Sequence, residues 1–74
     1  MHINKRVLLL AILKKEPNEN LIDIVAMLEA SRLFRFKEGK RLLKELKSEG
    51  YIDEAGLTPK GHKAAKEAEE EFRL

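Results

Sequence analysis

The absence of cysteine from a chain of only 74 residues is the feature that most limits what it can fold into. No disulfide can form, and the two histidines, His2 and His62, are too far apart in the sequence to build a Cys/His zinc cluster. Apolar side chains must therefore form the core, and a hydrophobic fraction of 43% is high enough to exclude intrinsic disorder. We expect one globular domain over residues 1–74, with no metal and no cofactor.

The longest apolar run, Val7–Leu13, has seven residues, whereas a membrane-spanning helix needs about 20. Charged residues 14–16 follow it, where a signal peptide would have small residues. We therefore expect a cytoplasmic protein without a membrane anchor. The run predicts a helix buried on more than one side, from about Asn4 as N-cap to Lys15, although periodicity alone leaves a buried strand as an alternative.

Capping and turn residues divide the rest of the chain into three further helices and a hairpin. Asn20 is a good N-cap for the second helix, Gly50 a good terminator for the third, and Thr58 an N-cap for a fourth with Pro59 at its first position. The predicted helices are Leu21–Glu29, Phe36–Ser48 and a last one from Pro59, with strands at 51–52 and 57–58. The predicted fold is mainly α with a small β-hairpin.

Positive charge is concentrated in residues 32–47. The whole chain has a net charge of +2, but this segment has seven Lys or Arg against two Glu, which gives +5. Residues 1–31 sum to zero and residues 48–74 to −3. Such asymmetry is a candidate electrostatic footprint of a binding partner.

The helix predicted over Phe36–Ser48 has two opposed faces. At 100° per residue its basic side chains, Lys37, Lys40, Arg41 and Lys44, lie within about 100° of one another, opposite the apolar ones. Gly39 lies on the apolar face, and because glycine costs about 1 kcal/mol there, we expect another backbone to approach it closely. Phe34 is expected to pack in the core, with an exposed contact role as the alternative.

Two segments resemble a known family. LLKELKSEGYI, residues 42–52, resembles the end of the recognition helix and the first wing strand of MarR- and PadR-type bacterial regulators. LTPKG, residues 57–61, resembles the segment that leaves their wing and starts the next helix. The chain also resembles very small YjcQ-like winged-helix proteins of bacteria and prophages. The resemblance implies a winged helix-turn-helix with a three-helix core, a short wing and a C-terminal helix.

It also implies sequence-specific binding of double-stranded DNA by a small prokaryotic transcriptional regulator. Helix 36–48 would then enter the major groove, with Lys37, Lys40 and Arg41 near the bases and Lys44 on a phosphate. Arg41 is the best candidate for reading guanine. Further candidates for phosphate contact flank this helix or lie on the first one, and their alternative is an ordinary solvated surface: Arg32, Arg35, Lys5 and Arg6.

One departure from the family pattern favours a different function. Only four residues separate Ile52 from Leu57, and two of them are acidic, so a wing that touches phosphates is not expected. The alternative is a winged-helix module for protein–protein interaction. We expect no enzyme and no small-molecule ligand, since the sequence has no catalytic triad or phosphate-binding glycine loop, and His62 and the acidic run 69–71 are expected to be solvated.

The last predicted helix has a narrow apolar stripe of small residues that ends in one large one. Its members are Gly61, Ala64, Ala65, Ala68 and Phe72. Small side chains let another helix approach closely, so the stripe predicts a homodimer through the C-terminal helix. The alternative is that the stripe packs on the first helix of the same chain.

Overall fold

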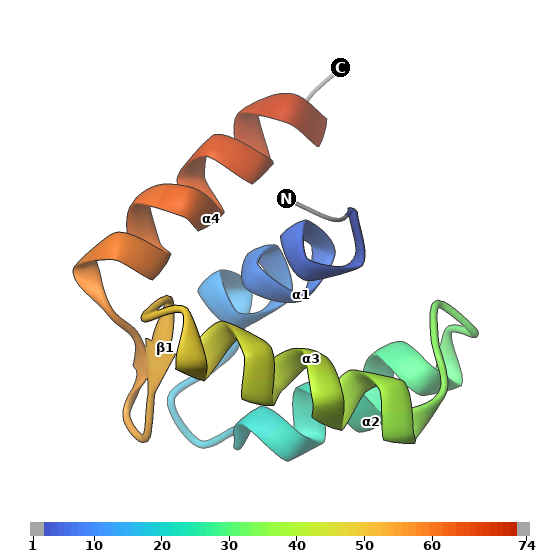
Figure 1. Cartoon of the computed structure of the whole chain (residues 1–74). Coiled ribbons are helices and arrows are strands. Elements are labelled where there is room, and N and C mark those ends of the chain that lie inside the picture. The colour runs from blue at the N-terminus through green and yellow to red at the C-terminus, as the bar shows by residue number, and fades with distance from the viewer. Residues whose placement is uncertain (1–2, 73–74) are drawn as a thin grey trace.

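The computed structural model describes residues 3–72, which form four helices and one antiparallel hairpin (Figure 1). The elements are α1 (Ile3–Lys14), α2 (Leu21–Ala30), α3 (Phe36–Ser48), β1 (Ile52–Asp53), β2 (Gly56–Leu57) and α4 (Pro59–Phe72). The expectation of a mainly helical fold with a small hairpin is confirmed. Within residues 3–72, no helix is long and apolar enough to cross a lipid bilayer.

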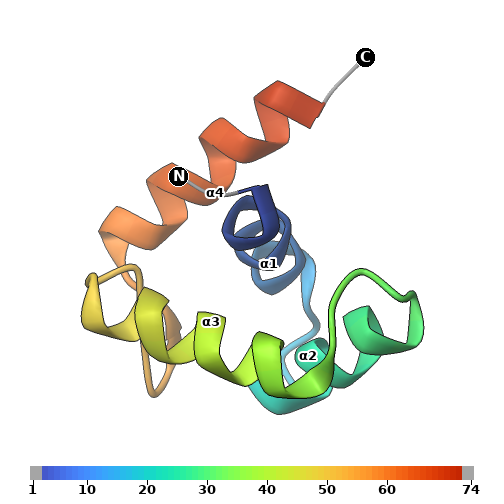
Figure 2. The same cartoon turned by 45° about the vertical axis from the view of Figure 1, so that its right-hand side comes forward.

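Helix α1 is the centre of the structure. Figure 2 views it nearly end on, with α4 on one side and α2 and α3 on the other. The apolar run Val7–Leu13 is helical, so the alternative of a buried strand is wrong. A helix that is apolar around most of its circumference must be covered on more than one side. The core brings together buried side chains from all four helices and the hairpin: Leu8, Leu9, Ile12, Ile24, Val25, Phe34, Leu42, Leu46, Ile52 and Ala65.

The helix ends differ from the sequence prediction by one or two residues. Asn4 lies inside α1 and does not cap it, and Lys15 lies just beyond the end of the helix. Asn20 is the N-cap of α2, as expected, and its backbone N–H donates to Oδ2 of Asp23 at 3.0 Å. Ala30 belongs to α2, so the connection to α3 is shorter than predicted.

The connection between α2 and α3 fixes where α3 begins. Arg32 has φ of +60°, the left-handed conformation that usually favours glycine. It ends α2 in a Schellman motif, in which the N–H of Leu33 donates to the carbonyl of Leu28 at 3.2 Å and that of Arg32 to Glu29 at 2.8 Å. Oε2 of Glu29 then accepts the N–H of Phe36 at 3.0 Å, so a side chain of α2 satisfies the first donor of α3.

The hairpin is tighter than predicted, because Asp53 pairs with Gly56 and only two residues form the loop. Gly61 brings α4 against it. A Cβ at Gly61 would lie 1.7 Å from the carbonyl oxygen of Tyr51, so only glycine fits there. Thr58 caps α4 as expected: its Oγ1 accepts the N–H of Gly61 at 3.0 Å and donates to the carbonyl of Gly50 at 2.6 Å.

The small-residue stripe of α4 packs against α1 of the same chain, which is the alternative stated above. Ala65 and Ala68 are buried, whereas Phe72 at the far end is 40% exposed. Ion pairs between Arg6 and Glu71 and between Lys14 and Glu69 join the same two helices. Homodimerisation through α4 stays a prediction, but most of the stripe on which it was based is already covered.

Candidate nucleic-acid interface

Helix α3 has the two opposed faces that its sequence predicts. Gly39, Leu42 and Leu46 are buried, and half-buried Leu43 and Phe36 pack at the edge of the core. All four basic residues predicted for the outer face are exposed: Lys37, Lys40, Arg41 and Lys44. The apolar face is held by α2 and α1, so the basic face is presented to solvent on a rigid element.

The reason for glycine at position 39 differs from the one expected. A Cβ at Gly39 would lie 2.5 Å from Cγ1 of Val25 and 2.6 Å from Cε1 of Phe34. The three atoms nearest to that position all belong to these two apolar side chains, so glycine is required there by side-chain packing and not by the backbone that we expected. Phe34 is only 8% exposed, which confirms its place in the core. Gly39 thus lets α2 and the connection pack directly on α3.

The acidic residues at the inner edge of α3 face α1. Glu38 accepts a hydrogen bond from Nδ2 of Asn4 at 3.4 Å. Glu45 and Glu49 both bind Nζ of Lys5, each at 3.1 Å. The Lys5 ammonium donates hydrogen bonds to Glu45 and Glu49, and these bonds, that to Glu45 most, raise its pKa above the ordinary value of 10.5. Glu38, Glu45 and Glu49 therefore each have a partner on α1.

The cations on the outer face are left without such partners. Among residues 3–72, no carboxylate forms an ion pair with Lys37, Lys40 or Lys44. Arg41 has a carboxylate near it, with Nε at 3.6 Å from Glu45, but its side chain is 69% exposed and such surface pairs contribute little. Nζ of Lys40 lies 5.9 Å from the ring centroid of Phe36.

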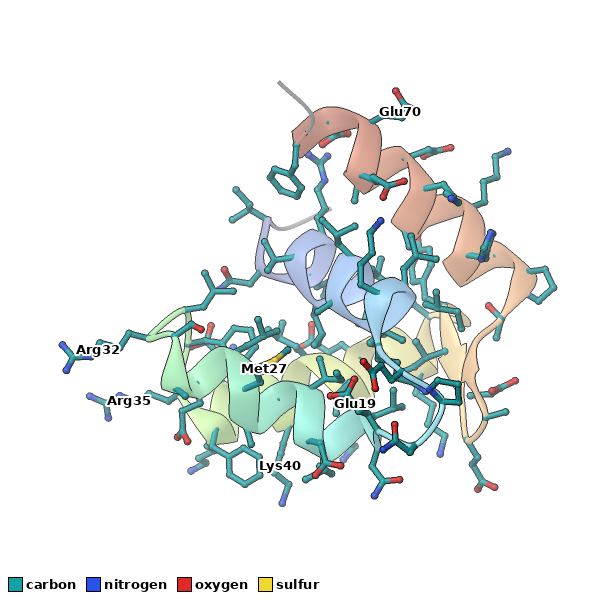
Figure 3. All side chains as sticks on the ribbon, turned by 180° about the vertical axis from the view of Figure 1, so that it is seen from behind. Glu19, Met27, Arg32, Arg35, Lys40 and Glu70 are labelled. Atoms are coloured by element: carbon teal, nitrogen blue, oxygen red, sulfur yellow. The ribbon has the colours of Figure 1, made fainter. Side chains whose placement is uncertain are left out.

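Arg32 and Arg35 extend this basic surface to the beginning of α3. Both are exposed, and Figure 3 shows both side chains reaching away from the same end of the molecule. Arg35 also lines a hollow of about 380 Å³ together with Lys37, Glu38 and Arg41. Three of the four lining residues are cationic, so this hollow suits an anionic group better than a cationic one.

One cation of the same surface was left out of the predicted site, and two others have a different role. Lys47 is exposed in the last turn of α3, and the charge count of the segment already included it. Lys5 and Arg6, named as further candidates for phosphate contact, both form ion pairs within the chain. Lys5 is also largely covered, with 14% of its side chain exposed.

The hairpin tip is acidic, and the side chain of Asp53 stabilises its turn. Oδ1 of Asp53 accepts the N–H groups of Ala55 at 2.9 Å and Gly56 at 3.1 Å, which fixes the turn. Lys60, in the first turn of α4, contacts the segment just before the hairpin. Its Nζ lies 4.6 Å from the ring centroid of Tyr51 and donates to the carbonyl of Glu49 at 2.8 Å. The tip therefore offers no cation to a phosphate, as expected.

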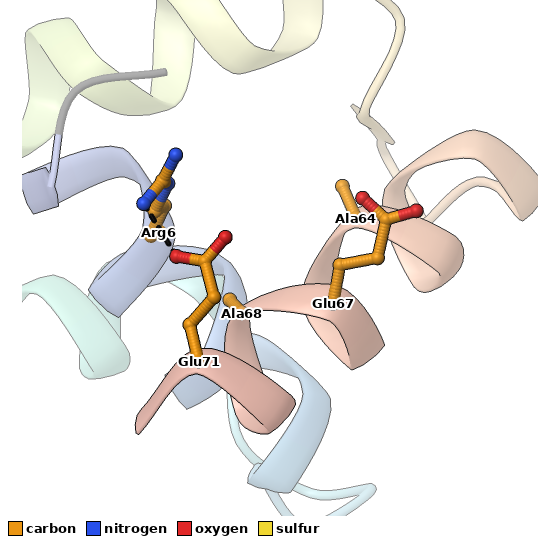
Figure 4. A pocket seen from close by; sticks show the side chains of 5 residues that line it. All are labelled: Arg6, Ala64, Glu67, Ala68 and Glu71. Atoms are coloured by element: carbon orange, nitrogen blue, oxygen red, sulfur yellow. Dashed lines mark hydrogen bonds and ion pairs between the residues drawn. The ribbon is translucent and has the colours of Figure 1, made fainter. Parts of the chain in front are cut away.

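A second hollow, of about 220 Å³, lies between α1 and α4 (Figure 4). The ion pair of Arg6 with Glu71 lies across it, and Glu67 and two alanines complete its lining. Its charges are mixed and its most basic group is already paired. It lies apart from the basic face of α3 and resembles a groove between two packed helices.

No protein-family model, no curated protein and no solved structure matches this chain. The resemblance to MarR- and PadR-type regulators and to YjcQ-like proteins therefore stays a prediction, supported by the quoted segments.

Proposed function

We propose that the chain is a winged helix-turn-helix protein that binds double-stranded DNA as a small transcriptional regulator, with α3 in the major groove. The order of elements supports this, because α2 and α3 are joined by a short connection and are followed by a hairpin and a closing helix. The single observation that carries the proposal is the outer face of α3, where Lys37, Lys40 and Lys44 have no carboxylate partner among residues 3–72, while Glu38, Glu45 and Glu49 have partners on α1.

The dimensions and chemistry of α3 suit this role. Its 13 residues make a helix of about 20 Å, and the major groove of B-DNA is about 12 Å wide and admits one helix. We assign Lys37, Lys40 and Arg41 to the base edges and Lys44 to a phosphate. Arg32 and Arg35 are then placed to contact phosphates beside the start of the helix. Guanidinium pairs bidentately with guanine, so Arg41 is the residue expected to contribute sequence preference.

Titration of the isolated chain with duplex DNA at several salt concentrations tests the proposal. Four to six phosphate contacts would give a slope of log K against log salt of about −4 to −5. Replacing Lys37, Lys40, Arg41 and Lys44 together with Glu is expected to abolish binding, while circular dichroism shows unchanged helicity because all four side chains are exposed. Binding by this variant at the level of the parent chain would show that α3 is not the docking helix.

The second candidate function is a protein-interaction module that does not bind DNA. The acidic, two-residue hairpin loop favours it, because the wing of a DNA-bound regulator would bring Asp53 and Glu54 towards phosphates. The same titration separates the two. If the chain does not bind duplex DNA even in low salt, where electrostatic binding is strongest, the protein-interaction function is favoured.

A further inference from the structure

The outer face of α2 is apolar, and nothing in the described chain covers it. Ile22 is 45% exposed and Met27 is 49% exposed, and both belong to a ten-residue helix. Ala26 and Ala30, four and eight residues after Ile22, are also exposed. Leu33, in the connection after the helix, is 39% exposed. Clustered exposure of large apolar side chains is typical of an interaction site.

Charge is distributed unequally along the same helix. Glu19 and Asp23 lie at its beginning, whereas Arg32 and Arg35 follow its end. Glu29 in the last turn is also acidic, but its carboxylate accepts the N–H of Phe36 and the two arginines outnumber it. Figure 3 shows this arrangement, with Glu19 near one end of α2, Met27 between, and the two arginines at the other end. Arg32 and Arg35 have no carboxylate partner among residues 3–72. An acidic beginning and a basic end frame the apolar face.

We propose that this face binds a second copy of the chain, with the two α2 helices packed antiparallel about a two-fold axis. In that arrangement the acidic beginning of each helix lies beside the basic end of the other, and the apolar surfaces meet between them. A parallel arrangement would put like charges together at both ends. The face is thus complementary to itself in one orientation, which is the property that a two-fold dimer requires.

The side chains on this face also suit a helix pair. Ala26 and Ala30 allow the helix axes to approach, and Met27 is a flexible side chain that fills irregular space. The helix is only about 15 Å long, so the interface lies at the small end of the size range and the dimer is weak. The small-residue stripe of α4 is less suitable because α1 already covers it.

This inference is tested without nucleic acid, so its outcome does not depend on DNA binding. It leaves Lys37, Lys40, Arg41 and Lys44 free and shares only Arg32 and Arg35 with the proposed phosphate contacts. Sedimentation equilibrium of the full chain up to about 500 μM is expected to show a monomer–dimer equilibrium. A chain that stays monomeric over this range would overturn the proposal and would leave the face of α2 for a different protein.

Two matched variants locate the interface. Met27→Glu and Phe72→Glu each place a carboxylate at an apolar side chain of similar exposure, 49% and 40%. We expect Met27→Glu to weaken dimerisation by at least about ten-fold and Phe72→Glu to change it by less than about two-fold. The reverse result would overturn the proposal in favour of a dimer through α4.

A charge exchange tests the antiparallel orientation. Asp23→Arg and Arg32→Asp are each expected to weaken self-association by roughly five-fold, since each makes both ends of the pair repulsive. The double variant, Asp23→Arg with Arg32→Asp, restores opposite charges at both ends only if the helices are antiparallel, so it should self-associate more tightly than either single variant. Asp23 also accepts the N–H of Asn20, but a loss of that cap persists in the double variant and does not explain a rescue. Absence of rescue would overturn the antiparallel arrangement.

Discussion

Helices α1 and α3 both carry basic side chains, but within residues 3–72 all of those on α1 pair with carboxylates, whereas on α3 only Arg41 does. Lys5, Arg6 and Lys14 on α1 each pair with a carboxylate of α3, its end, or α4. Lys37 and Lys44 on α3 have no such partner among residues 3–72. A net charge of +2 therefore says little about binding, because the lysines without an ion pair among residues 3–72 include three on one face of α3.

The arrangement on α3 is unfavourable for an isolated protein. Lys37 and Arg41 are four residues apart, as are Lys40 and Lys44, and like charges at this spacing destabilise a helix by about 0.2–0.5 kcal/mol per pair. Glu38 and Glu45 relieve this repulsion only in part, because both have partners on α1 and only Glu45 also lies near a cation of the outer face, Arg41. Under the proposed function, DNA phosphates would relieve the rest.

The largest expected effect is on DNA affinity, and it should follow the removal of two cations from α3 but not the removal of two from α1. Lys37→Ala with Lys44→Ala is expected to reduce the salt slope of DNA binding by about 1, since Lys44 alone of the two is assigned to a phosphate, and the affinity by roughly 50-fold at about 0.1 M salt. Arg6→Ala with Lys14→Ala makes the same change in net charge, but its cations are already paired, so we expect less than about three-fold. Equal losses in a filter-binding or anisotropy titration would remove the distinction between the two helices.

The next effect concerns the two faces of α3. Gly39→Leu would force a side chain into the space of Val25 and Phe34, and overpacking of this kind costs typically about 1–3 kcal/mol. Lys40→Leu adds the same side chain one position later, on the exposed face, where the free energy of unfolding should change by less than about 0.5 kcal/mol. Urea denaturation of both variants measures the difference. Equal midpoints would contradict the assignment of the faces.

Several features of α3 and α4 were predictable from the sequence because they depend only on residues close together in the chain. The opposed faces of α3 follow from side-chain periodicity, and the start of α4 from Thr58 and Pro59 as capping residues. The segment +5 in charge coincides with the exposed cations that the structure describes. The exposure of all six predicted DNA-binding side chains agrees with what their positions indicated.

What could not be predicted depends on contacts between residues far apart in the sequence. Periodicity shows that Gly39 faces inward, but it does not show that Val25 and Phe34 fill the space. Likewise, no local pattern pairs Lys5 with Glu45 and Glu49, which are about forty residues later and are brought near only when α3 packs on α1. The left-handed conformation of a non-glycine residue, Arg32, is set by the Schellman motif and gave no signal of its own.

The smallest expected effect is the alkaline titration of Lys5. The carboxylates of Glu45 and Glu49 raise its pKa above 10.5, so the folded state holds this proton more tightly than the unfolded state. The stabilisation is therefore complete below pH 10.5 and is lost as the pH rises through the raised pKa. Lys47→Met is a control with the same change in charge, because Lys47 is exposed and has no ion pair among the described residues.

Urea denaturation between about pH 8 and pH 11.5 measures this contribution, since the range brackets the ordinary pKa of lysine. Lys5→Met should be less stable than Lys47→Met at pH 8, and the difference should shrink as the pH rises above 10.5. The other lysines titrate in the same range in both variants, so their effects cancel in the difference. A difference that stayed constant to pH 11.5 would mean that Lys5 stabilises the protein through its aliphatic part. Lys5 would then differ from the exposed lysines of α3 in the packing of its side chain and not in the energy of its ion pairs.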